Sequence, residues 1–203
     1  AFNGVVAHRS TPGIVPNEKH SFGYTTFSVL GPMARTVEDM VLMYSSIVRH
    51  DPNDPLSAPM DPADYVSVRE VDLSTLKIAV SEDLGFAPVD DRIRATFRER
   101  VDIFKSAFKE CSPRDPVLDT VDRTNWILRS QIFLANHREK YQKNRDALGP
   151  NVRSNYEAGL EISAEEVAWA TQEQTNIYRH METFFDDVDI LIAPTVPVPP
   201  FPV

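Results

Sequence analysis

Apolar side chains recur every three or four residues over one stretch near the start of the chain, which is the spacing of a single helix face. This stretch carries Val37, Met40, Val41, Tyr44, Ile47 and Val48. Thr36 precedes it and can cap the first turn with its hydroxyl, and Asp39 stands where a capping box places an acid. The pattern predicts a helix that begins after Thr36 and ends near His50, where an Asp-Pro pair follows.

Two short apolar runs, at residues 76–80 and 189–193, are rich in β-branched residues and bounded by turn residues. They predict buried strands of one sheet, with Ile78 and Ile192 shielded from solvent. A helical pattern from about Asp90 to Cys111 follows the first run. A strand, a turn and a helix in that order are typical of an α/β fold.

Helical patterns fill most of the chain between those two runs. Apolar residues at a seven-residue interval predict a long helix from about Leu118 to Leu148, ended by Gly-Pro. A short helix is expected at 151–159. Ser163 and Glu166 then form a Ser-x-x-Glu capping box that opens another helix. The sequence therefore predicts an α/β protein that is rich in helix.

The charge balance bears on the possible partners. The chain has 203 residues, with 21 Lys and Arg against 30 Asp and Glu, a net charge of −9. Nucleic acids and anionic membranes both favour clustered basic residues, so we expect neither as a partner. No apolar run approaches the roughly 18 residues that a spanning helix needs, and no signal-peptide pattern opens the chain.

Metal and cofactor chemistry find little support in the composition. The five histidines show no His-x-x-x-His spacing, and the acidic loop at 51–62 lacks the Gly and Glu of a calcium-binding loop. Only 7 residues are glycine, the residue on which most nucleotide-binding loops depend. We therefore expect no metal and no cofactor. His137 and His180 lie among polar neighbours in predicted helices and are expected to be exposed.

Cys111 is the single cysteine, which excludes an internal disulfide and a Cys-x-x-Cys site. A chain with this cysteine usage is expected in a reducing cytoplasm. Nothing near Cys111 in the sequence would lower its thiol pKa, so we interpret it as a structural thiol at a helix end. Residue patterns alone reveal no self-contained catalytic set.

Three stretches, in order along the chain, resemble the amidase signature family. Residues 1–16 (AFNGVVAHRSTPGIVP) resemble the family's Asn-Gly-Val-Val stretch. Residues 28–39 (SVLGPMARTVED) are very similar to its Gly-Pro-Met-Ala-Arg-Thr segment. Residues 189–195 (DILIAPT), with Pro197, are similar to a family strand that ends in Pro-Thr. The intervening residues follow the family's layout, so the resemblance spans essentially the whole chain.

The resemblance implies a mixed sheet flanked by helices, with 1–203 forming part of one amidase domain. Residues 1–80 would give loops, a helix and a strand of its core, 81–188 a mainly helical portion, and 189–203 a strand with a Pro-rich tail. The chain departs from the family at Ala7-His8, Ser10 and Ile14, where Gly-Leu or Gly-Phe, Pro and often Arg are usual. These departures lie in a loop region and affect substrate detail rather than the fold.

Family catalysis uses a Ser–cis-Ser–Lys triad, in which the lysine accepts a proton and activates a nucleophilic serine. The family positions that carry this triad precede the residue matching Ala1. The resemblance therefore implies no catalytic residue in this chain, which we interpret as the middle of a longer amidase and expect to be inactive alone.

The resemblance also assigns roles to particular residues. It implies that Trp126, Pro194 and Thr195 line the substrate pocket of the parent enzyme, which would take a small amide. Three residues of the second motif, Arg35, Thr36 and Asp39, are expected to be structural.

Two other functions stay open at this stage. The chain resembles the A subunit of a glutamine-dependent aminoacyl-tRNA amidotransferase, which shares the amidase fold. A non-catalytic helical binding module, with its apolar stripes turned to a partner, is the alternative of another class. Surfaces uncovered in so short a chain would favour self-association. The identity of the substrate cannot be read from these residues.

Overall fold

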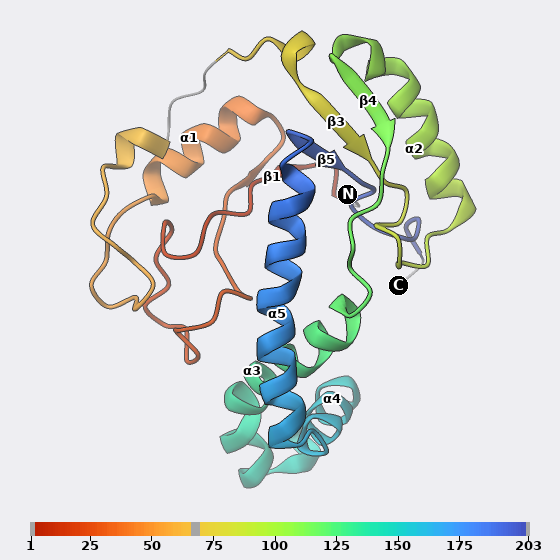
Figure 1. The fold of residues 1–203 in the computed structure, drawn as a ribbon. Coiled ribbons are helices and arrows are strands. Elements are labelled where there is room, and N and C mark those ends of the chain that lie inside the picture. Colours follow the sequence, from red (N-terminus) through yellow and green to blue (C-terminus); the bar gives the residue numbers. More distant parts are fainter. Residues whose placement is uncertain (1–2, 66–69, 202–203) are drawn as a thin grey trace. The chain divides into compact units, whose positions relative to one another are not determined.

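The computed structural model describes residues 3–65 and 70–201 and divides into two compact units. Unit 1 holds the described residues within 3–70 and 131–156, and unit 2 those within 71–130 and 157–201. The strands are β1 Val6–Ala7, β2 Met33–Ala34, β3 Lys77–Val80, β4 Glu110–Pro113 and β5 Ile190–Ile192 (Figure 1). The helices are α1 Val37–Ile47, α2 Asp91–Phe104, α3 Val121–Lys143, α4 Pro150–Leu160 and α5 Ala164–Phe185. Short 3-10 turns occur at Pro62–Tyr65, Leu73–Thr75, Lys105–Ala107 and Arg145–Ala147. None of the helices in the described ranges is both long and apolar enough to cross a membrane.

In unit 1, α1 begins where its sequence pattern places it. Thr36 has extended backbone angles, and its Oγ1 accepts a hydrogen bond from the Asp39 N–H at 3.1 Å. The predicted cap is thus confirmed, while the helix ends at Ile47, three residues before His50. The apolar face of α1 forms a small core in which Val15, Tyr44 and Val48 are buried together. Beside this helix, β1 and β2 pair antiparallel.

In unit 2, β3 lies between β4 and β5 in a three-stranded parallel sheet. The two apolar runs therefore belong to one sheet, as predicted, and Ile78 is fully buried at its centre. The expectation of burial fails for the second run. Because β5 lies at the edge of this sheet, Ile190 is 41% exposed and Ile192 is only half-buried.

The predicted helix over 90–111 is correct in its first part and wrong at its end. Asp90 caps α2 by accepting from the Arg92 N–H at 2.9 Å, and the helix stops at Phe104. Residues 110–113 instead form β4, in which Cys111 pairs with Ile78. The reason is tertiary: the open edge of β3 offers hydrogen bonds that the local helical pattern cannot reveal.

The two faces of this sheet carry different helices. Ala79 packs against Phe184 of α5 and against Val188 just beyond it. Side chains alternate across a strand, so the next residue, Val80, points to the opposite face. There Val80 lines a cavity together with Phe97 and Val101 of α2. Thus α5 and α2 lie on opposite faces of the sheet.

The helical segment largely follows its sequence pattern. The long helix predicted over 118–148 is α3, followed by a 3-10 turn, and the short helix expected at 151–159 is α4. The capping box is confirmed in both directions: the Glu166 N–H donates to Ser163 Oγ at 3.2 Å, and Glu166 Oε2 accepts from the Ser163 N–H at 3.0 Å. Within unit 2, the Thr120 hydroxyl donates to Glu173 at 3.0 Å, which ties the chain before α3 to α5.

Candidate functional site

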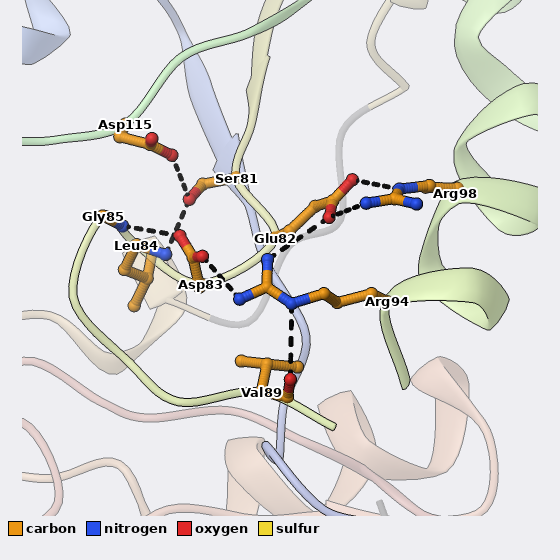
Figure 2. A network of polar contacts seen from close by, with 9 residues as sticks. All are labelled: Ser81, Glu82, Asp83, Leu84, Gly85, Val89, Arg94, Arg98 and Asp115. Atoms are coloured by element: carbon orange, nitrogen blue, oxygen red, sulfur yellow. Dashed lines mark hydrogen bonds and ion pairs between the residues drawn. The ribbon is translucent and has the colours of Figure 1, made fainter. Parts of the chain in front are cut away.

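A buried serine organises the loop that leaves the carboxyl end of β3. Ser81 is 1% exposed, and its hydroxyl donates to Asp115 Oδ1 at 2.6 Å (Figure 2). The same oxygen accepts from the Leu84 N–H at 2.7 Å. Asp115 follows β4 by two residues, so this one hydroxyl joins the loops after two neighbouring parallel strands.

The loop after β3 bends through two consecutive left-handed residues. Leu84 has φ +58° and Gly85 has φ +78°. A leucine in this conformation is strained, by roughly 1–2 kcal/mol. Two hydrogen bonds hold the bend: the one from Leu84 to Ser81, and one from the Gly85 N–H to Asp83 Oδ1 at 2.9 Å. The loop geometry is therefore fixed by its own polar side chains.

Two arginines of α2 close the network from one side. Arg94 donates to Asp83 Oδ2 at 2.7 Å and to Glu82 Oε2 at 3.4 Å, and its Nε donates to the Val89 carbonyl at 3.3 Å. Arg98, one helical turn later, donates to both carboxylate oxygens of Glu82, at 2.5 and 2.7 Å. Figure 2 shows this double bridge between the loop and the helix.

These contacts keep the acids charged. Hydrogen bonds from Arg98 in the first place, and also from Arg94, lower the pKa of Glu82 against the opposing effect of partial burial. Arg94 in the first place, and then the Gly85 N–H, lower the pKa of Asp83. Because both acids are paired with guanidinium groups, the cluster of Glu82, Asp83, Arg94 and Arg98 carries no net charge near neutral pH.

Two adjoining cavities lie beside this network in unit 2. The first, about 380 Å³, is lined by Val80, Glu82, Asp83, Arg94, Pro113, Arg114 and Asp115. The second, about 280 Å³, is mainly apolar and lies against α2, lined by Val80, Glu82, Phe97, Arg98, Val101, Asp102 and Pro113. They share Val80, Glu82 and Pro113. Ligands of open α/β sheets bind outside the carboxyl ends of the strands, which is where these cavities lie.

No sequence motif marks this network. A signal was present, since Ser81, Glu82 and Asp83 directly follow a predicted buried strand and two arginines stand one turn apart on the next predicted helix. The sequence does not supply Asp115, because the helical pattern runs to Cys111 and so hides the strand that precedes this residue.

The three residues assigned to the substrate pocket lie in two different segments of unit 2. Trp126 lies on α3, 39% exposed, and none of the cavities described above is lined by it. Pro194 and Thr195 follow the end of β5 by two and three residues, and they are half-buried and exposed respectively. They therefore stand at the carboxyl end of the parallel sheet, and their role in a pocket stays a prediction.

Of the residues expected to be structural, Thr36 is the helix cap described above. Asp39 serves this cap through its backbone N–H, while its side chain is exposed. No ion pair joins Arg35 to Asp39 among the residues that the structure describes, and the Arg35 side chain is exposed.

The remaining candidate groups lack catalytic geometry. Across the described ranges, no serine hydroxyl is hydrogen-bonded to a lysine and no group of three His, Cys, Asp or Glu could hold a metal ion. Cys111 is half-buried in β4 rather than at a helix end, and this burial raises its pKa. His180 is exposed as expected, but His137 is half-buried because its ring packs on Phe133, with centroids 4.4 Å apart.

Comparison with known proteins gives the family. The family model for amidases matches residues 1–203, so this chain belongs to the amidase family. The chain is 24% identical over 207 residues to an acylamidase from Rhodococcus erythropolis, with 100% of this chain and 43% of the relative covered. It is 25% identical over 226 residues to the A subunit of a glutamyl-tRNA(Gln) amidotransferase from Carboxydothermus hydrogenoformans, covering 99% and 47% of the two chains.

Solved structures share the fold. The chain superposes on a bacterial aryl acylamidase of the amidase signature family with a TM-score of 0.71 at 18% identity, covering 94% of this chain and 41% of the other. A second amidase crystal structure gives a TM-score of 0.69 at 19% identity, covering 98% and 42%. The fold is thus that of amidase signature enzymes, and the chain spans less than half the length of these relatives.

Proposed function

We propose that this chain forms part of an amidase that hydrolyses C–N amide bonds by serine-based acyl transfer. The observation that carries the proposal is the family match over residues 1–203, supported by the fold shared with an aryl acylamidase. The reaction needs a serine nucleophile, a lysine that takes its proton, and backbone N–H groups that stabilise the oxyanion. In this proposal those groups come from the portion of the enzyme that precedes the residues matching this chain.

The described residues support the second half of the proposal, that the chain alone does not turn over amides. A nucleophile must lie within about 2.6–3.2 Å of its base. The two most buried serines of the hydrogen-bonded set have other partners, since Ser81 donates to Asp115 and Ser130 donates to the Trp126 carbonyl. Lys105 is in turn paired with Asp102 at 2.7 Å. None of these pairs provides a serine with a basic lysine.

In the complete enzyme, we assign Trp126, Pro194 and Thr195 to the wall of the amide pocket. The position of Pro194 and Thr195 after a parallel strand supports this assignment, because loops at that edge commonly carry binding residues. The half-exposed indole of Trp126 offers apolar surface to a substrate. Replacing Trp126 by Ala in the complete enzyme should raise KM for an aryl amide more than it lowers kcat.

An assay of the purified 203-residue chain tests the proposal. The chain is incubated with aliphatic and aryl amides and hydroxylamine, and acyl transfer is detected as hydroxamate. The chain alone should give no product, and the protein that also contains the family's serine and lysine region should give it. Turnover by the chain alone, or a complete protein that is inactive on every amide, would contradict the proposal.

A second function is favoured by one group of relatives, the glutamyl-tRNA(Gln) amidotransferase A subunits. Such a protein would release ammonia from glutamine only in a complex. The chain's net charge of −9 gives it little attraction for tRNA, so we place the stand-alone amidase first. Glutaminase activity that appears only when the other components of such a complex are added would reverse this order.

We also propose that the complete enzyme works in the cytoplasm. A separate proposal is that the isolated chain self-associates. The edge of β5 is apolar, with Ile190 exposed, and carries none of the charges or prolines that protect edge strands. On unit 1, Val37, Leu42 and Met43 of α1 are exposed as well. Light scattering should show concentration-dependent oligomers. A monomer at every concentration would refute self-association.

A further inference from the structure

Helix α2 covers one face of the sheet without packing tightly against it. Its apolar stripe consists of Ile93, Phe97, Val101 and Phe104, and all four side chains are only half-buried. All of α2 lies within the described ranges, and none of its residues is fully buried. Because protein interiors are normally close-packed, an apolar stripe that stays half-buried beside a sheet indicates unfilled space next to it.

That space is the cavity of about 280 Å³ between α2 and the sheet. Its apolar wall is formed by Phe97 and Val101 from the helix and by Val80 and Pro113 from the strands. Val80 and Pro113 are register partners in β3 and β4, so their side chains point to the same face of the sheet. The helix and the strands therefore enclose one apolar volume from its two sides.

Polar contacts at the start of α2 hold the helix at this distance from the strands. The guanidinium groups of Arg94 and Arg98 are bound to the two acids of the loop after β3. The cap residue Asp90 donates its backbone N–H to the Pro197 carbonyl at 2.8 Å, in the segment after β5. The helix would have to break these contacts to settle onto the strands, so the cavity is a stable feature of unit 2.

The charged groups around the cavity are paired within the protein. Arg98 donates two hydrogen bonds to the carboxylate of Glu82, and Asp102 is paired with Lys105 at 2.7 Å. A charged ligand would lose part of its hydration on entry without gaining a free partner of opposite charge among these groups. A neutral apolar molecule has no such cost, and it gains free energy because apolar surface is removed from water on both sides.

We propose that the cavity between α2 and the sheet binds a small neutral apolar molecule, such as a substituted benzene, between the side chains of Phe97 and Val101 and those of Val80 and Pro113. An apolar cavity of roughly 150 Å³ is sufficient to bind benzene, so this larger cavity has room for one ring with a short substituent. The aromatic ring of Phe97 favours an aromatic ligand through edge or offset stacking. Such binding needs neither an amide group nor a reaction, so it stands or falls independently of the proposed amidase function.

A fluorine NMR titration of the 203-residue chain with 4-fluorotoluene, 4-fluorobenzoate and 4-fluorobenzylamine tests the proposal. The three compounds share one ring, and the last two are charged at neutral pH. 4-Fluorotoluene should bind saturably and about tenfold or more tightly than either charged compound, because a charge without a partner is costly to desolvate. Equal or tighter binding of a charged compound, or no saturable binding of 4-fluorotoluene, would overturn the proposal.

A pair of substitutions on α2 locates the site. Val101→Trp fills the cavity and should weaken the binding of 4-fluorotoluene about tenfold or more. Ile103→Trp is the matched control, because it introduces the same side chain at a residue that is 65% exposed and lines neither cavity, and its affinity should equal that of the parent chain. Far-UV circular dichroism checks that both variants are folded. Unchanged affinity in folded Val101→Trp, or an equal loss in Ile103→Trp, would refute the assignment.

Hydrogen exchange of the parent chain gives a second measurement that needs no variant. A ligand that fills the space beside α2 should slow amide exchange in α2 and leave exchange in α1, which belongs to unit 1, unchanged. Exchange that stays unchanged in α2 at a saturating concentration of 4-fluorotoluene, or that slows equally in α1, would place the ligand elsewhere and contradict the proposal.

Discussion

Replacing Ser10 by alanine should stabilise unit 1. Ser10 is 1% exposed, and its hydroxyl has no hydrogen-bond partner among the residues that the structure describes. A buried hydroxyl without a partner costs roughly 1–3 kcal/mol by mutational data. Alanine removes this cost and leaves a gap no larger than one oxygen atom, so we expect a net gain of about 1 kcal/mol. Amidases usually have proline at this position, which likewise carries no hydroxyl.

Ser81 supplies a matched control, because it has the same residue type and the same 1% exposure. Its hydroxyl, however, donates to the Asp115 carboxylate and accepts from the Leu84 N–H. Ser81→Ala removes a charge-assisted hydrogen bond and leaves that N–H without its partner. A loss of about 2–3 kcal/mol is expected for unit 2.

The two units need separate readouts, which hydrogen exchange followed by mass spectrometry provides. Peptides from α1 report the opening free energy of unit 1, and peptides from β3 report that of unit 2. Ser10→Ala should slow amide exchange in α1 and leave exchange in β3 unchanged. Ser81→Ala should speed amide exchange in β3 and leave exchange in α1 unchanged. Faster exchange in α1 of Ser10→Ala would refute this reasoning. It would mean that the Ser10 hydroxyl has a hydrogen-bond partner, or that the lost packing of its oxygen costs more than the unpaired hydroxyl does.

Three further predictions concern single groups. Thr36→Ala should lower the stability of α1 by about 0.5–2 kcal/mol, seen as faster exchange in its first turn, whereas Thr36→Ser should not. Asp90, whose pKa is lowered from 3.8 to about 2 chiefly by its hydrogen bonds with Arg92, favours the folded state above pH 3.8. This contribution should fade as the pH falls from 3.8 towards 2, and urea titrations of Asp90→Asn should show a weaker fall over that window; parallel pH curves would contradict it. The Cys111 thiol, with its raised pKa, should react with iodoacetamide near pH 8 more slowly than a free cysteine, and equal rates would show that it is neither shielded nor shifted.

The caps and the local periodicities could be predicted because they depend on residues close in the chain. Thr36 and Ser163 each accept a hydrogen bond from an N–H three residues away, so both caps can be predicted from the sequence. The same holds for α4 and most of α3. The amidase family could also be recognised from the sequence, because its motifs lie in order along the chain.

The pairing of strands that are distant in the sequence could not be predicted. The helical pattern continues to Cys111, yet β4 forms over Glu110–Pro113 because β3 presents a free edge beside it. The exposure of Ile190 likewise depends on which strand lies at the edge of the sheet, and a short apolar run carries no sign of that.

The sequence by itself determined the family, the α/β class, and the helices whose caps and apolar faces are local. Only the tertiary structure decided that Ser81 meets Asp115, 34 residues away, and that Arg94 and Arg98 close on the loop after β3. The physical reason is the parallel sheet: adjacent strands bring their carboxyl ends together only after a helical crossover, so the residues that meet there are remote in sequence. The polar network after β3 is a product of that crossover.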